Sequence, residues 1–363
     1  MNEHIFFLFS DLGLGGVQRK IVDINNYIGK SKKYSHIVPH IIVRYSSNFS
    51  FKKQISNSSV IIHQAPLFCG RRLGIFFMLY ILMLSYKYKP RTFIIFLQYN
   101  LLHLFFIKCL YFKKIYKLIL IQENILSLEN RKEYTEKIYD SNHLKFLYTL
   151  PDVIISPTKY IKYDLIQNFH VKEEKILVIE SWTTKKTLIK NKKTIDIVYC
   201  GRFAKQKRLD IAIKIIKKVK ESLPMVNVFF IGEGKEEIKL KQIIEEAHLD
   251  KNIKILSSTH KIFNYFSRSK IFILTSEFEA DTLVIIEAMT QEVIPVILKR
   301  LGVGERIESG KNGFIEENET AMINRIIYLL THEEERKKIS MMTRKSIIDN
   351  PWENVVEKYS SLF

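Results

Sequence analysis

Two glutamates eight positions apart are the side chains of this sequence best placed to do chemistry. Glu279 and Glu287 follow residues 270–276, KIFILTS, whose apolar run is typical of a buried strand. One carboxylate should therefore lie beyond the end of a strand and the other on the next helix. Ionised carboxylates can accept hydrogen bonds from the vicinal hydroxyls of a sugar or a ribose. Because ligands of open α/β sheets bind beyond the carboxyl ends of the strands, the pair predicts a hydroxyl-binding site there.

Two cations follow an earlier predicted strand in the same way. Arg202 and Lys207 lie in GRFAKQKRLD, residues 201–210, directly after the apolar run DIVYC. Two fixed positive charges at the end of a strand can neutralise a departing diphosphate. A solvated basic loop is the alternative, and it is the better interpretation of Lys205 and Arg208. For Arg202 and Lys207 together we favour a role in binding.

A glycine loop precedes the first predicted helix. In GLGGVQR, residues 13–19, the backbone N–H groups at Gly15 and Gly16 can approach a phosphate without an intervening side chain. The spacing is not G-x-G-x-x-G, and no acidic residue ends the second predicted strand to hold a ribose. The loop is therefore either a contact for phosphate or acceptor or a plain structural turn, rather than a dinucleotide-binding motif.

Strand and helix patterns alternate along the chain and predict an α/β protein with two doubly wound Rossmann-like domains. We expect an acceptor-side domain over 1–185, a lysine-rich linker over 186–194 and a second domain over 195–345. A final amphipathic helix within 346–363 is expected to pack back on the first domain. The expected strands are 4–9, 37–44, 59–63, 93–97, 117–121 and 153–156, then 195–199, 226–231, 253–256, 271–274 and 294–297. The expected helices include 16–29, 73–88, 100–112, 207–221, 235–247, 260–268, 282–290 and 319–331.

The composition is that of an ordinary enzyme-sized protein. A chain of 363 residues with 47% hydrophobic content can bury two cores. The three cysteines lie far apart, without CxxC or nearby histidine spacing, which argues against a disulfide framework and a zinc site. The first residues read as a strand and a glycine loop rather than a secretion signal, so a cytoplasmic location is expected.

Positive charge is concentrated in the first half. Residues 1–190 carry 28 Lys and Arg against 13 Asp and Glu, whereas residues 191–363 carry 29 against 25. No acidic residue occurs between Asp23 and Glu123. Such a region attracts an anionic lipid surface or a nucleic acid. Long apolar runs interrupt it, and no nucleic-acid motif is present, so we expect the inner face of a membrane as partner and no nucleic acid.

The apolar run of residues 73–84 is too short to span a bilayer. It is either a core helix or an interfacial one, and we favour core for its apolar side chains. Membrane contact is expected instead at the flanking cations. These are Arg71, Arg72, Lys87, Lys89 and Arg91.

In this order the motifs resemble the retaining glycosyltransferases of family 4, which have the GT-B fold of two Rossmann-like domains facing each other across a cleft. The resemblance covers most of the chain, and the C-terminal half carries its specific part. The residues that carry it are Gly15, Gly16, Arg202, Lys207, Glu279, Glu287, the glutamate Glu305 after a glycine turn, and the turn GKNGFI at 310–315.

The resemblance implies a role for each site residue. Arg202, Lys207 and Glu279 would be catalytic, with the two cations on the diphosphate and the glutamate on the donor sugar. Glu287 would bind the ribose. Gly15, Gly16, Asp281, Thr282, Leu283 and Glu305 would complete donor binding, and Glu123, Asn124 and His103 are candidates on the acceptor side.

The chain departs from the family pattern between the two glutamates. Ala280, Asp281 and Thr282 replace a glycine-rich tripeptide, and Leu301 replaces the first glycine of a usual pair. Asp281 or Thr282 is expected to cap the following helix instead. This departure leaves the identity of the donor open.

The resemblance also implies an activity. A hexose or N-acetylhexosamine would pass from a UDP- or GDP-sugar, which is a substrate and not a cofactor, to a saccharide or lipid-linked saccharide. Such reactions build capsule, O-antigen or lipopolysaccharide. No cofactor is expected. No metal is expected either, because no Asp-x-Asp motif is seen at the site. A nucleotide-sugar epimerase of GT-B shape and a non-catalytic sugar-nucleotide-binding subunit remain as alternatives.

Overall fold

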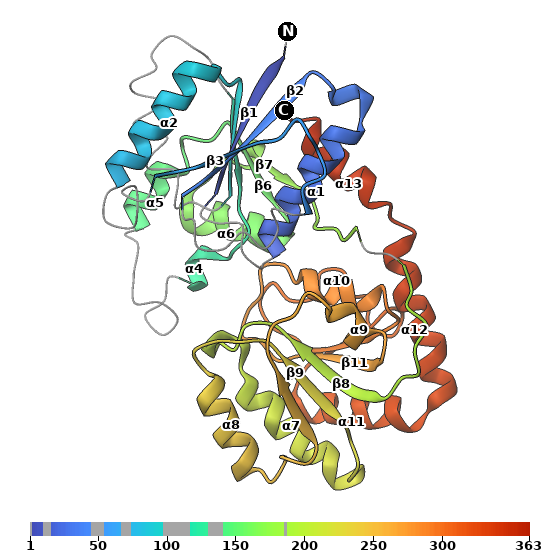
Figure 1. Cartoon of the computed structure of the whole chain (residues 1–363). Helices are drawn as coiled ribbons and strands as arrows, with labels where there is room; N and C mark the ends of the chain where they lie inside the picture. The colour runs from blue at the N-terminus through green and yellow to red at the C-terminus, as the bar shows by residue number, and fades with distance from the viewer. Residues whose placement is uncertain are drawn as a thin grey trace. The chain divides into compact units, whose positions relative to one another are not determined.

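The chain folds as two compact units. The computed structural model describes residues 2–9, 16–44, 54–66, 74–96, 117–129, 141–184 and 187–363 (Figure 1). Met1–Ser181 and Trp352–Phe363 form the N-terminal unit, and Trp182–Pro351 form the C-terminal unit. Each unit contains one parallel sheet with its own helices. The expected α/β class with two Rossmann-like domains is therefore confirmed.

The sheet of the N-terminal unit has seven parallel strands in the order β3-β2-β1-β4-β5-β6-β7. The strands are β1 (Glu3–Phe9), β2 (Ile37–Val43), β3 (Ile61–Gln64), β4 (Thr92–Phe96), β5 (Lys117–Ile121), β6 (Val153–Ser156) and β7 (Ile176–Val178). The helices are α1 (Gly16–Lys30), α2 (Gly74–Tyr88), α4 (Leu126–Glu129), α5 (Ser141–Leu147), α6 (Lys159–Phe169) and α13 (Trp352–Ser360). The central strands form because their apolar side chains are buried on both faces of the sheet, as in Ile5–Phe9 of β1.

The C-terminal helix α13 packs against α1 within the N-terminal unit. Its Glu357 accepts hydrogen bonds from the hydroxyls of Tyr27 and Tyr34, each at 2.9 Å, and pairs with Lys33. The hydroxyl of the buried Tyr359 donates to the carbonyl of Ile179 at 3.1 Å. The last helix therefore completes the first unit, although α12 (Glu333–Ile348) before it belongs to the second.

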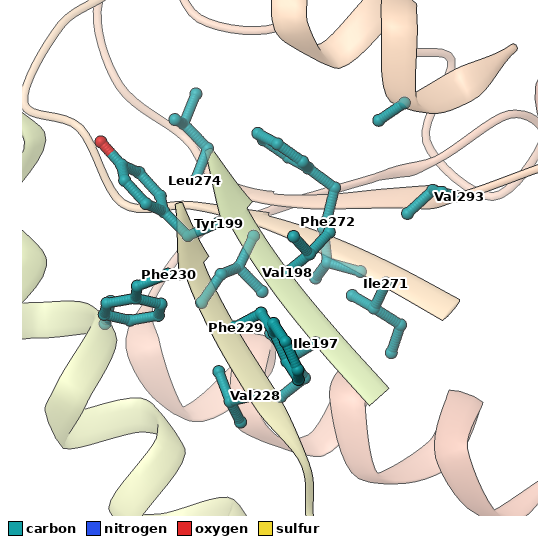
Figure 2. Close-up of a cluster of buried hydrophobic side chains, with 14 of the residues drawn as sticks. Ile197, Val198, Tyr199, Val228, Phe229, Phe230, Ile271, Phe272, Leu274 and Val293 are labelled. Atoms are coloured by element: carbon teal, nitrogen blue, oxygen red, sulfur yellow. The ribbon is translucent and has the colours of Figure 1, made fainter. Parts of the chain in front are cut away.

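The sheet of the C-terminal unit has six parallel strands in the order β10-β9-β8-β11-β12-β13. The strands are β8 (Ile195–Cys200), β9 (Val228–Ile231), β10 (Ile253–Leu256), β11 (Ser269–Leu274), β12 (Ile294–Leu298) and β13 (Phe314–Glu316). The other helices are α7 (Leu209–Ser222), α8 (Glu237–Glu246), α9 (Ile262–Phe266), α10 (Leu283–Met289) and α11 (Glu319–Thr331). Figure 2 shows the core of this unit, where side chains of β8, β9 and β11 pack together.

Residues 187–194, expected as part of the linker, belong to the C-terminal unit. Gln291 holds this segment in place: its side chain accepts from Ile189 N at 3.0 Å and donates to the carbonyl of Thr187 at 2.9 Å. The ammonium of Lys193 donates to the carbonyl of Gln291 at 2.7 Å, and burial lowers the pKa of Lys193 to about 8. The chain therefore crosses between the units at 181–182 and 351–352.

Candidate functional site

The candidate site lies where the strand order of the C-terminal unit reverses. From β8 the chain continues through β9 to β10 on one side, and β11 then pairs with β8 on its other side. The loops that leave the carboxyl ends of β8 and β11 must diverge at such a switch point, and ligands of doubly wound sheets bind there. Arg202 and Lys207 lie on the loop after β8, and Glu279 lies on the loop after β11.

Lys207 and Glu279 form a largely buried ion pair at this switch point. The Lys207 Nζ lies 2.6 Å from Glu279 Oε1, and the exposed fractions of the two side chains are 13% and 7%. The structure thus brings together two residues that stand 72 positions apart in the sequence. The attraction between the two opposite charges is stronger here than at the protein surface, because little water screens it.

Arg202 is exposed on the same loop and provides a second cation. Its carbonyl accepts a hydrogen bond from the hydroxyl of Tyr199 at 3.0 Å, which fixes the first turn of the loop. Burial raises the pKa of Tyr199 well above its usual range, the charge of Glu279 raises it further, and the charge of Arg202 opposes the rise. Tyr199 therefore stays a neutral hydrogen-bond donor beneath the charged groups.

Hydrogen bonds join the loop after β8 to the loop after β11. The side chain of Gln206 donates to the carbonyl of Phe278 at 2.7 Å, and Glu277 N donates to the carbonyl of Gln206 at 2.9 Å. The hydroxyl of Thr275 donates to the carbonyl of Arg208 at 3.0 Å. Lys207 and Glu279 are therefore held by the backbone of both loops as well as by their own contact.

Arg208 contributes more to this site than a solvated basic loop would. Its backbone is left-handed, with φ of 47°, and it occupies the N-cap position of α7 without a side-chain capping bond among the described residues. Its guanidinium pairs with Asp210 and with Glu277, each at 3.0 Å. The hydrogen bond to Asp210, followed by that to Glu277, raises the pKa of Arg208. Our interpretation of Arg208 was therefore incomplete, because its partner Glu277 is 69 positions away and no sequence pattern links them.

Two glycines allow the loop after β9 to approach the loop after β8. A Cβ on Gly232 would lie 1.9 Å from the carbonyl oxygen of Gly201, and one on Gly234 would lie 2.2 Å from that of Phe203. Phe203 N donates to the carbonyl of Glu233 at 2.9 Å across this contact. Neither glycine is among the predicted site residues, although GEG directly after a predicted strand is a signal of close backbone approach.

The loop after β11 carries two buried polar oxygens. The oxygens Ser276 Oγ and Asp281 Oδ2 are buried, and neither has a hydrogen-bond partner within the part of the chain that the structure describes. Buried polar atoms are normally satisfied, so these two oxygens are candidates for hydrogen bonds to a polar ligand. Of the two residues expected to cap α10, Asp281 and Thr282, Thr282 occupies the N-cap position, and among the described residues its side chain makes no capping hydrogen bond.

The remaining donor-side residues occupy neighbouring elements of the C-terminal unit. Glu287 is buried on α10, beside the apolar Ile286 and Ala288. Leu283 is the first residue of α10 and is half-buried. Glu305 is exposed on the loop after β12, a loop whose Leu301 accepts a hydrogen bond from Glu279 N at 3.1 Å.

The acceptor-side candidates lie in the N-terminal unit. Both carboxylate oxygens of Glu123 lie 2.7 Å from Nζ of the buried Lys20. Asn124 donates to Glu129 at 2.7 Å and accepts from Gln122. Both side chains are thus held by partners within their own unit. Gly16 is exposed at the start of α1.

Two predicted site residues, Gly15 and His103, lie outside the described residues. The expected helix over 100–112 also lies there. Within the described ranges, no group of three His, Cys, Asp or Glu side chains is arranged to hold a metal ion. The described helices include none that is both long enough and apolar enough to cross a membrane.

Comparison with known proteins gives a family match for the C-terminal unit and solved structures with a similar fold for the whole chain. Residues 180–346 match the family model described as Glycosyl transferases group 1. The two Rossmann-like domains have the fold of GT-B glycosyltransferases. HepE of Anabaena, solved in complex with UDP and glucose, superposes with a TM-score of 0.81 at 17% identity, covering 99% of both chains. TarM superposes with a TM-score of 0.79 at 14% identity, covering 99% of this chain and 98% of that one. At such identities the likeness shows the fold alone.

Sequence relatives have more specific names. Poly(ribitol-phosphate) alpha-N-acetylglucosaminyltransferase of Staphylococcus aureus is 27% identical over 216 residues, which are 58% of this chain and 43% of the relative. N-acetyl-alpha-D-glucosaminyl L-malate synthase of Bacillus anthracis is 25% identical over 171 residues, 46% of this chain and 44% of the relative. The O-antigen biosynthesis glycosyltransferase WbnH of Escherichia coli is 27% identical over 175 residues, 48% and 49% of the two chains. The chain thus spans about half the length of the curated relatives it matches.

Proposed function

We propose that this protein is a retaining glycosyltransferase of family 4. It would transfer a hexose or an N-acetylhexosamine from a nucleotide diphosphate sugar to a saccharide or lipid-linked saccharide. The observation that carries the proposal is the Lys207–Glu279 pair, because it places a cation and a hydroxyl acceptor together at the switch point of the unit that matches the family model. The names of the relatives support a role in the synthesis of O-antigen, capsule or a similar surface polysaccharide.

The proposed mechanism uses the charges of this site. Glu279 accepts hydrogen bonds from hydroxyls of the donor sugar, and Glu287 accepts those of the ribose. Arg202 and Lys207 stabilise the negative charge that develops on the diphosphate as its bond to the anomeric carbon breaks. The acceptor hydroxyl attacks the anomeric carbon from the face that the diphosphate leaves, and the departing phosphate oxygen takes its proton. Two protein cations supply the charge that a metal ion provides elsewhere, so we expect transfer without a metal.

The pairing of Lys207 with Glu279 bears on how the donor is recognised. A diphosphate that draws the ammonium of Lys207 toward itself leaves Glu279 in need of new donors, and sugar hydroxyls provide them. The diphosphate of the donor thus replaces Glu279 as the partner of Lys207, and the sugar hydroxyls replace Lys207 as the partners of Glu279. On the same loop, the oxygens of Ser276 and Asp281 that have no hydrogen-bond partner among the described residues offer further acceptors for sugar hydroxyls.

The location that fits this function is the cytoplasmic face of a membrane, where lipid-linked acceptors are found. The basic, acid-free stretch between Asp23 and Glu123 supports it, because anionic lipids attract such a surface. This location is part of the proposal.

The function can be tested by transfer assays with Glu279→Gln and Lys207→Met. UDP-glucose and UDP-N-acetylglucosamine serve as donor probes, with lipid-linked saccharides from a bacterial membrane extract as acceptors. Either substitution should lower sugar transfer at least a hundredfold, since one group that stabilises charge at a reaction centre commonly contributes that much. Lys241→Met is the matched control, because Lys241 pairs with Glu237 on the exposed face of α8 in the same unit.

Three results would argue against the proposal. Near-normal turnover by both site variants would remove the roles of these residues. Interconversion of two sugar nucleotides without acceptor would indicate an epimerase. Donor binding without transfer to any acceptor would indicate a non-catalytic subunit.

A further inference from the structure

Helix α2 of the N-terminal unit has an apolar face that is exposed to solvent in the part of the unit that the structure describes. Its inner face is ordinary core: Phe77, Ile81 and Leu84 are buried. The outer face carries four large apolar side chains. Their exposed fractions are 59% for Ile75, 50% for Leu79, 59% for Met83 and 76% for Tyr86. These four residues are called the α2 outer face below (Figure 1 shows the helix).

The sequence of α2 differs from that of an ordinary surface helix. A helix on the surface of a globular protein normally pairs an apolar stripe with a charged face. In GIFFMLYILMLSYKY the only charged residue is Lys87, in the last turn, and no acidic residue is present. A helix that is apolar all round is normally buried, so the exposure of this one among the described residues marks the α2 outer face as a candidate contact surface.

The charges around α2 favour an anionic occupant. Lys87 and Lys89 are exposed at the carboxyl end of the helix, and the sequence has no acidic residue from 24 to 122. Arg91 is exposed as well but is already paired with Glu3. The exposed Tyr86 directly precedes Lys87 in the sequence. Tyrosine and lysine side chains are both typical of the boundary between lipid tails and headgroups.

The length of α2 sets its orientation in a bilayer. Fifteen residues make a helix of about 22 Å, shorter than the roughly 30 Å of hydrocarbon in a bilayer. Its inner face is also fixed to the core of the unit through Phe77 and Ile81. The helix can therefore lie in the plane of the interface, with the α2 outer face toward the acyl chains, but it cannot span.

We propose that the α2 outer face docks the N-terminal unit on an anionic lipid surface. Ile75, Leu79 and Met83 enter the boundary of the acyl chains, and Lys87 and Lys89 contact lipid phosphates. The inference assigns the membrane contact mainly to apolar side chains, whereas the sequence alone favoured the flanking cations. It rests on the proposed membrane location and makes that location specific to one face of one helix.

Vesicle binding by the full-length protein tests the inference. The probes are vesicles of phosphatidylglycerol mixed with phosphatidylcholine, and vesicles of phosphatidylcholine alone. The variant is Leu79→Ser with Met83→Ser, and the matched control is Met341→Ser with Met342→Ser, two exposed methionines on α12 of the other unit. The protein should bind the anionic vesicles, the α2 variant should bind them at least tenfold more weakly, and the control should bind like wild type. Lys87→Gln and Lys89→Gln should each weaken binding about fivefold at low salt, since a basic residue near an anionic membrane contributes about a factor of five.

Three results of these binding experiments would overturn the inference. Equal binding of wild type and the α2 variant to anionic vesicles would place the contact elsewhere. No binding by wild type would remove the membrane as partner. Self-association that the α2 variant abolishes, measured by light scattering without lipid, would assign the face to a second copy of the chain.

The inference and the proposed function fail in different experiments. The α2 outer face is outside the candidate site, so transfer to a soluble saccharide acceptor without membranes should be the same for wild type and the α2 variant. Lost vesicle binding with unchanged transfer to the soluble acceptor would support the inference. Vesicle binding without any transfer would instead contradict the proposed function alone.

Discussion

The Lys207–Glu279 pair allows a quantitative test of how the site is built. Lys207→Met removes the ammonium but keeps most of the apolar stem, and it leaves the carboxylate of Glu279, 7% exposed, without its cation. Removing one partner of a buried pair costs about 3–5 kcal/mol, because the remaining charge stays desolvated. Glu279→Gln leaves an amide oxygen for Lys207 and should cost less, about 1.5–3 kcal/mol. The double variant removes both charges, so its cost should fall short of the sum of the two singles by about 1.5–3 kcal/mol.

Urea unfolding measures this coupling in the C-terminal unit. The chain has two tryptophans, and only Trp182 lies in that unit, so Trp352→Phe leaves a fluorescence reporter for it. With a urea dependence of about 1–3 kcal/mol per molar, a loss of 3 kcal/mol lowers the midpoint by about 1–3 M. The control is the same cycle on Lys241 and Glu237, an exposed pair at 2.7 Å, where the coupling should be about 0.3–0.5 kcal/mol.

The cycle can refute the reasoning. Costs that add to within about 0.5 kcal/mol would show that Lys207 and Glu279 do not interact energetically. A coupling equal to that of the exposed control would show that burial does not strengthen the pair. Either result would remove the electrostatic basis of the candidate site.

Three further predictions concern other parts of the fold. His40 is buried between His4 and His63, with ring nitrogens 2.8 Å apart on each side, and burial lowers its pKa to about 3. Below pH 6.5 this histidine binds a proton in the unfolded chain but stays neutral in the folded one, so the free energy of unfolding of the N-terminal unit should fall with pH, by up to about 2 kcal/mol at pH 5. His40→Gln should flatten this pH dependence in urea titrations. An unchanged slope would contradict the prediction. Gly232→Ala should destabilise the C-terminal unit by about 1–3 kcal/mol or more, because the new Cβ meets a backbone carbonyl at 1.9 Å; an unchanged thermal midpoint would be inconsistent with this contact. Glu357→Ala should speed amide hydrogen exchange in α13 about tenfold and leave exchange in α12 unchanged, because two tyrosine hydroxyls lose their acceptor. An equal change of the exchange rate in both helices would show that Glu357 does not hold α13.

Much of the fold could be predicted because buried parallel strands are continuous apolar runs. The expected strand over 271–274 lies within β11, and the expected helix over 319–331 has the bounds of α11. Short elements could not be predicted in this way. β7 has only three residues, and β13 has three as well, too few for any periodicity. Their places in the sheets depend on neighbours that are distant in sequence.

The linker shows a different limit. Lysine-rich polarity over 186–194 was a fair signal for an exposed segment, yet Gln291 holds its backbone to the C-terminal unit. The local sequence pattern does not predict a contact with a glutamine about a hundred positions away. The same applies to Gln206, whose bonds to the loop after β11 fix the site from outside the predicted motif.

The site itself was predicted as a set of residues, and the contact between them required the fold. Spacing suggested that Glu279 and Lys207 lie at the same edge of a sheet, but only the pairing of β8 with β11 makes them neighbours. The apolar helix shows the opposite case. The sequence could not show which face of α2 is buried, because both faces are apolar.

Thermal unfolding of the full-length protein with sugar nucleotides tests the central claim most directly. UDP-, GDP- and dTDP-sugars carry a diphosphate, whereas a CMP-sugar carries a single phosphate and serves as the control ligand. At a hundredfold excess over the dissociation constant, a ligand of the folded state adds about 2.7 kcal/mol of stability. The account predicts that one diphosphate class raises the unfolding midpoint of the C-terminal unit, that Lys207→Met abolishes this rise, and that Lys241→Met preserves it. No rise with any diphosphate sugar, or an equal rise in the Lys207→Met variant, would contradict the assignment of this site.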